Sequence, residues 1–294
     1  MKKIFCFVLA LILGTQIAGC SRTKSSATKP AYHSETVSQA ALRGASLQSL
    51  LASANPRKPL VFSHRGDPYD APEHSFAGYD EAIKQGSAFI EQDVWLSRDG
   101  KLFVSHDDNL RRTTGQNVNI TTTPASQLQS LRLRNGEHLH TLASVFKRYR
   151  SKVHYLVEAK NNSLSNDMET QKALLAALRR FHMGNNVIVQ DTKIQGLAYI
   201  HTHEGKQKVT TLWLMPGDNV DQRRANIETA PTWLNFISID LLTATRADIL
   251  NIKAHHFLSN VWTISEYSDI QTVKELQVDS VFTNETRRTL SMLN

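Results

Sequence analysis

Short apolar segments rich in β-branched residues recur along the chain, separated by stretches with helical periodicity. The helical pattern is clearest over residues 170–181, where Ala173, Leu174, Ala177 and Leu178 form one stripe. Strands that alternate with helices predict a parallel sheet wrapped by helices. The predicted strands are residues 60–63, 88–90, 102–104, 155–157, 187–189, 210–214, 236–239, 261–263 and 280–282.

The nine predicted strands are one more than a TIM-type barrel contains. The second segment continues to Leu96 and the third starts at Lys101, so only residues 97–100 separate them, and a parallel crossover needs about a dozen residues or more. These two strands must therefore form an antiparallel hairpin, and Asp99-Gly100 is a strong hairpin-turn signal. The pattern thus predicts an α/β fold, a TIM-type (β/α)8 barrel with a β-hairpin excursion after the second strand.

Two acidic side chains, Glu91 and Asp93, occupy the carboxyl end of the second predicted strand. Residues two apart on a strand share a face and lie roughly 7 Å apart. Carboxylates placed in this way repel each other unless a cation lies between them, and hard divalent ions prefer oxygen ligands. A metal site is one reading, and a solvated acidic edge is the commoner explanation for such a pair alone. Glu158 and Lys160 repeat the spacing, either as a third metal ligand and a phosphate-binding cation or as a salt bridge.

Histidines at two further strand ends are candidate acid/base groups. His64 follows the first strand and precedes Arg65, whose forked donors suit phosphate oxygens. A two-residue hairpin turn would set His106 opposite Asp93, and a four-residue turn would set it opposite Glu91. Either turn keeps His106 on the carboxylate face, whereas a three-residue loop would turn it away.

Taken in order, these motifs resemble the glycerophosphodiester phosphodiesterase family of TIM-barrel enzymes over about residues 60–290. The matching motifs are His64-Arg65-Gly66, Pro72-Glu73-His74-Ser75, Glu91 with Asp93, the stretch 99–115 that includes His106, Glu158-Ala159-Lys160, and Trp262-Thr263.

The resemblance implies hydrolysis of glycerophosphodiesters to sn-glycerol 3-phosphate and an alcohol. It further implies a divalent cation, Ca²⁺ or Mg²⁺, held by Glu91, Asp93 and Glu158. His64 and His106 would be the catalytic acid and base, and Arg65, Lys160 and Trp262 would bind substrate. The identity of the alcohol and the roles of the two histidines stay open at this stage.

Three positions depart from the family pattern. His74 replaces the usual Asn, Ser75 replaces Thr, and Asn284 replaces Asp in the near-terminal motif. None of these changes removes a proposed ligand or catalytic histidine. The alternatives are a phospholipase C or D that acts on intact lipids, and a surface lipoprotein that binds a phosphodiester without turning it over.

The N-terminus has the features of a bacterial lipoprotein signal peptide, residues 1–20. Lys2 and Lys3 precede an apolar run that is short for a membrane span, and residues 17–20 resemble a lipobox that would make Cys20 the acylated mature N-terminus. Ser21 favours the outer membrane, so we expect a lipid-anchored protein of the cell envelope. Residues 21–57 are predicted to be a tether and lead-in helix, and residues 58–294 the barrel.

Cysteine content and charge narrow the functional classes further. Cys6 is the other cysteine of the chain and would leave with the signal peptide, so no disulfide is expected in the mature protein. The formal net charge is +7, but Lys and Arg are spread along the chain without an aromatic-interleaved patch. The expected partners are a small-molecule substrate and a membrane, and not a nucleic acid.

Overall fold

The computed structural model describes residues 44–160, 168–217 and 219–293. The predicted signal peptide, Cys20 and most of the predicted tether lie outside these residues. No helix within the described ranges is long and apolar enough to cross a membrane.

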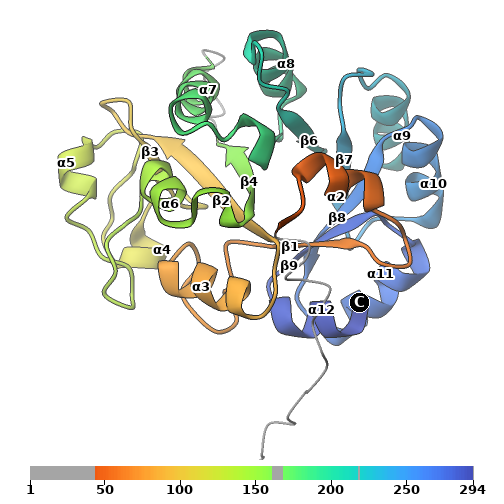
Figure 1. Ribbon diagram of the computed structural model, residues 1–294, viewed down its shortest axis with the longest axis horizontal. Coiled ribbons are helices and arrows are strands. Elements are labelled where there is room, and N and C mark those ends of the chain that lie inside the picture. The colour runs from red at the N-terminus through yellow and green to blue at the C-terminus, as the bar shows by residue number, and fades with distance from the viewer. Residues whose placement is uncertain (1–43, 161–167, 218, 294) are drawn as a thin grey trace, which may run out of the picture. The chain divides into compact units, whose positions relative to one another are not determined.

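Eight parallel strands close into a barrel, as the sequence predicts (Figure 1). Around the ring the order is β1-β2-β4-β5-β6-β7-β8-β9, and β9 pairs with β1 to close it. The strands are β1 Leu60–Ser63, β2 Phe89–Leu96, β4 His154–Ala159, β5 Val187–Asp191, β6 Thr210–Leu214, β7 Phe236–Asp240, β8 Leu258–Ile264 and β9 Ser280–Thr283.

Helices follow the barrel strands on the outside of the ring (Figure 1). These are α3 Phe76–Lys84, α7 Glu169–Phe181, α8 Ile194–His203, α9 Val220–Glu228, α10 Arg246–Ala254, α11 Tyr267–Leu276 and α12 Thr286–Leu293, with α6 Leu142–Tyr149 before β4. The 3-10 turns η1 Arg150–Lys152 and η2 Gly184–Asn186 precede β4 and β5.

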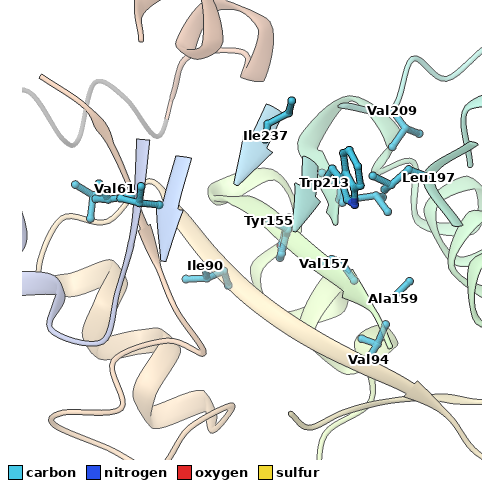
Figure 2. Close-up of a cluster of buried hydrophobic side chains, with 14 of the residues drawn as sticks. Val61, Ile90, Val94, Tyr155, Val157, Ala159, Leu197, Val209, Trp213 and Ile237 are labelled. Atoms are coloured by element: carbon cyan, nitrogen blue, oxygen red, sulfur yellow. The ribbon is translucent and has the colours of Figure 1, made fainter. Parts of the chain in front are cut away.

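Alternation along each strand separates an outer from an inner core. Outward residues such as Ile90 and Tyr155 pack against the helices in the larger apolar cluster, part of which Figure 2 shows. Inward residues form a second cluster inside the ring that includes Phe62, Phe89 and Leu156. Leu47 and Leu50 of α2 (Leu47–Ser53) complete this inner cluster.

The hairpin exists, but its predicted registers are wrong. Strand β3 (Leu102–Val104) pairs with β2 through Trp95 opposite Phe103, so residues 98–100 form a three-residue loop between Ser97 and Lys101. Gly100 has φ 81° and Asp99 does not have a positive φ, which fits a type I turn followed by a left-handed glycine. A two-residue turn would have needed positive φ at both central positions.

The excursion after β2 is also larger than a hairpin. Residues between β3 and α6 add the short helices α4 (Arg111–Thr114) and α5 (Ala125–Leu128). They enclose a small core of their own that includes Phe103, Leu110 and Leu128. This lobe carries His106 and Arg112 toward the barrel mouth.

Candidate active site

A cavity of about 460 Å³ opens at the carboxyl ends of the barrel strands. The alternation of side chains that builds the inner core also points side chains into this cavity. His64, Glu91 and Glu158 each lie two residues beyond an inward core residue and therefore share its direction. The lining residues are His64, Arg65, Glu91, His106, Glu158, Lys160, Gln190, Thr192, Leu214, Pro216, Gly217, Asp240, Trp262, Thr263 and Phe282.

Glu91 is buried and held at both carboxylate oxygens. Its Oε1 accepts a hydrogen bond from Gln190 Nε2 at 3.0 Å, and its Oε2 accepts one from the backbone N–H of Arg65 at 2.8 Å. Arg65 has φ 58°, a left-handed conformation that is uncommon outside glycine. Burial, and then the charge of Asp93, holds the pKa of Glu91 well above its usual range.

Asp93 is surrounded by positive and donor groups. Its Oδ2 lies 3.0 Å from His74 Nε2 and 3.4 Å from Arg65 Nε, and its Oδ1 lies 3.1 Å from Lys160 Nζ. Burial alone would raise the pKa of Asp93, but Lys160 and the hydrogen bond from His74 hold it well below its usual range.

Lys160 bridges two acids, because its Nζ also lies 2.8 Å from Glu158 Oε1. Burial, and then the charge of Asp93, raises the pKa of Glu158 to about 8. The three carboxylates predicted as metal ligands, Glu91, Asp93 and Glu158, thus meet where their negative charge is costly. Their oxygens and their need for positive charge fit a hard divalent cation.

His74 joins this group, although from the sequence alone it stands out only as a departure from the family pattern. Ligand atoms of His74, Glu91 and Asp93 all lie within 4.8 Å of one another, and all three residues are buried. The second ring nitrogen, Nδ1, lies 2.9 Å from the buried hydroxyl of Tyr79, which fixes the ring. The sequence could point to His74 only through its place in a motif. Its contacts with Asp93 and Tyr79 could not be predicted without the fold.

His64 lines the cavity and is supported by a neutral amide. Its Nδ1 lies 2.7 Å from Asn284 Oδ1, while Asn284 Nδ2 donates to Ser265 Oγ at 2.9 Å, which orients the amide oxygen toward the ring. His64 Nδ1 is then the donor, and Nε2 is left as an acceptor. Burial, and then the charge of Arg65, lowers the pKa of His64 to about 4.

His106 lines the same cavity but is supported by a carboxylate. Its Nδ1 lies 2.7 Å from Asp107 Oδ1, and Asp107 Oδ2 accepts a hydrogen bond from Arg112 Nε at 2.7 Å. Arg112 also forms a bidentate pair with Glu73. Burial lowers the pKa of His106, and the hydrogen bond to Asp107 opposes that effect.

The three-residue hairpin loop does not turn His106 away from the acids, contrary to the prediction for that register. Strand β3 ends at Val104, and Ser105 Oγ donates to the backbone carbonyl of Asp107, so His106 lies in a turn beyond the strand. Its carbonyl also accepts from Trp95 Nε1 at 3.1 Å. Strand alternation therefore no longer decides its direction.

Two further polar residues of the mouth, Gln190 and Asp240, were not singled out from the sequence. Each lies at the carboxyl end of its strand, two residues beyond an inward-facing position, which is the same signal that identified Glu91. Trp262, predicted to bind substrate, lines the cavity from β8.

A parallel (β/α)8 barrel whose mouth gathers three acids, two histidines and two cations belongs to the class of barrel enzymes with acid/base and metal-assisted chemistry. Comparison with known proteins gives the particular family. Residues 64–288 match the model of the glycerophosphoryl diester phosphodiesterase family. The chain belongs to this family of phosphoric diester hydrolases, which confirms the predicted family and enzyme class.

Relatives match over most of the chain. It is 26% identical to Bacillus subtilis YhdW over 231 residues, covering 76% of this chain and 93% of that protein. It is 25% identical to the glycerophosphodiester phosphodiesterase of Bacillus subtilis over 252 residues, covering 78% and 85%. A phosphodiesterase from Oleispira antarctica, solved with the product sn-glycerol-3-phosphate, shares the fold with a TM-score of 0.70, 20% identity, and coverage of 80% and 97%.

The contact between Asn284 and His64 generates a testable prediction. Asn284→Asp is expected to raise the pKa of His64 from about 4 by about 1–3 pH units, because a carboxylate beside Nδ1 stabilises the imidazolium. An NMR titration of the ring measures this directly. Ser265→Ala, which removes the partner of the Asn284 amide and adds no charge, should shift the pKa much less. A His64 pKa that is the same in Asn284→Asp and in the parent would contradict this contact.

Proposed function

We propose that this protein hydrolyses glycerophosphodiesters to sn-glycerol 3-phosphate and an alcohol, by acid/base catalysis at a divalent-cation site. The observation that carries the proposal is that His64 and His106 line one cavity with Glu91, Glu158 and Lys160. Membership of the family, and the product bound to the Oleispira relative, support the substrate class.

Glu91, Asp93 and Glu158 would hold the cation, and the oxygen-rich donor set suits Ca²⁺ or Mg²⁺. His74 Nε2 lies close enough to the oxygens of Glu91 and Asp93 to add a nitrogen donor. When bound, a divalent ion supplies Lewis-acid polarisation of the phosphoryl oxygens and positions the phosphate. Lys160 and Arg65 contribute further positive charge beside the carboxylates, and would meet the phosphate there.

The two histidines have environments that suit opposite roles. His64 donates through Nδ1 to Asn284, so its Nε2 is free to accept a proton from the attacking hydroxyl, which is either water or the substrate's own glycerol hydroxyl. Attack by the glycerol hydroxyl would release the alcohol and leave a cyclic phosphate, which water would then open to give sn-glycerol 3-phosphate. His106 is paired with Asp107, which stabilises an imidazolium that gives its proton to the leaving alkoxide. We therefore assign His64 as the base and His106 as the acid.

The decisive assay uses purified protein without residues 1–20, with glycerophosphocholine and phosphatidylcholine as substrates, each with and without a chelator. We expect glycerophosphocholine to yield sn-glycerol 3-phosphate and choline, with activity lost on chelation and restored by Ca²⁺ or Mg²⁺. Hydrolysis of only the intact lipid would support the phospholipase alternative. Binding without turnover would support the surface-binding alternative, and turnover that survives chelation would contradict the metal site.

Substitution of either histidine tests the acid/base assignment. His64→Ala and His106→Ala are each expected to lower kcat by about 10²- to 10⁴-fold, because each removes a proton-transfer step. His255→Ala is the matched control, since His255 is exposed and lies at the end of α10 before β8, at the opposite end of the barrel from the mouth. Full activity in either site variant would remove that histidine from the mechanism.

We infer a lipid anchor at Cys20 and a location in the cell envelope, with the outer membrane favoured by Ser21. The support is the signal-like sequence of residues 1–20 and the lipobox-like residues 17–20. In Cys20→Ala the precursor should stay unacylated and shift from the membrane fraction to the soluble fraction. Membrane partitioning that does not change would contradict the anchor, and metabolic labelling with a fatty acid measures acylation independently.

A further inference from the structure

The mouth of the barrel is divided into two chemically different halves. The acids, the histidines and the two cations come from β1, β2, β4 and the lobe after β3. In the closed ring β7 lies directly across from β2, and β8 lies directly across from β4. Residues at the ends of β6, β7 and β8 therefore face the catalytic half across the cavity.

This second half is mainly apolar and contains one charge. Leu214, Pro216 and Trp262 line it, and among the described lining residues from β6 to β8 Asp240 is the one that carries a charge. Asp240 and Trp262 are register partners on neighbouring strands, so the carboxylate and the indole lie side by side.

Asp240 keeps its negative charge available to a ligand. Its Oδ1 accepts a hydrogen bond from the backbone N–H of Leu242 at 3.0 Å, and no Lys, Arg or His within the described ranges forms an ion pair with it. Asp93 and Glu158 of the catalytic half differ in this respect, because both pair with Lys160.

We propose that Asp240 and Trp262 form a subsite for a positively charged alcohol head group, with a quaternary ammonium as its best ligand. A cation over an indole face is stabilised by the ring quadrupole, and a neighbouring carboxylate adds direct attraction. The same carboxylate repels the phosphate, which keeps it on the side of Arg65 and Lys160. This inference rests on the proposed function and names its substrate class.

A glycerol moiety would find few polar partners in this half. Trp262 Nε1, which has no hydrogen-bond partner among the described residues, and the Asp240 carboxylate could each bind a hydroxyl, whereas Leu214, Pro216 and the ring face of Trp262 offer apolar contact. A quaternary ammonium needs no hydrogen bonds, and its methyl groups would pack against these apolar side chains. The leaving alcohol, and not the glycerol common to all substrates, is thus the group that this half selects.

The kinetic test compares glycerophosphocholine with glycerophosphoglycerol, whose alcohol is uncharged. In Asp240→Asn the ratio of kcat/KM for these two substrates should fall about tenfold, because only the cationic alcohol loses an opposite charge. Asp221→Asn is the matched control, since Asp221 is an exposed acid on α9 that does not line the cavity, and it should leave the ratio unchanged. An equal loss for both substrates would leave the ratio unchanged, assign Asp240 to the glycerol and overturn the proposal. No loss for either substrate would also overturn it.

A binding test needs neither turnover nor a variant. Choline and its uncharged isostere, in which carbon replaces the nitrogen, are titrated into the parent protein and followed by NMR of the Trp262 indole. Choline should bind about tenfold more tightly, and Trp262→Leu should weaken it more than Trp262→Phe, which keeps an aromatic face. Equal binding of choline and the isostere would overturn the subsite. A protein that binds choline selectively but hydrolyses no glycerophosphodiester would contradict the proposed function and leave the subsite standing.

Discussion

The structure of the mouth depends on three carboxylates held where little water reaches them. Glu91, Asp93 and Glu158 are buried inside one end of the barrel, and buried charge is costly unless it is paired. Nearby groups pair with these charges. Lys160 forms ion pairs with Asp93 and Glu158, and Arg65 adopts a left-handed backbone conformation in which its N–H donates to Glu91. The same concentration of negative charge makes the mouth a candidate cation site.

The barrel supplies the site and the core through one geometric rule. Inward positions alternate along each strand, so the residue two places beyond an inward phenylalanine or leucine faces the cavity. Phe62 and His64, Phe89 and Glu91, and Leu156 and Glu158 are pairs of this kind. These side chains of the mouth therefore stand on the barrel strands or directly after them, above the inner apolar layer.

Segments that follow the strands supply the remaining groups of the site. His106 belongs to the lobe after β3, and the partner of His64 is Asn284, which lies 220 residues further along the chain. One histidine rests on a neutral amide and the other on a carboxylate, so two identical side chains acquire different proton affinities. The closed ring also makes the two sides of the cavity different, because it places Leu214, Pro216, Trp262 and Asp240 opposite the three acids.

The sequence by itself determined the number and positions of the strands, the closed barrel, and the candidate acids and histidines. These features follow from local periodicity and from motifs a few residues long, which short-range interactions encode. The hairpin was also predictable from its spacing, but its register was not, because loop length depends on which turn residue adopts a positive φ.

Only the tertiary structure decided which side chains share the mouth and what supports them. The contact of His74 with Asp93, the amide behind His64 and the division of the cavity into two halves join residues from separate strands and loops. No pattern within a single segment specifies such contacts, because they arise from the order in which eight strands close into a ring.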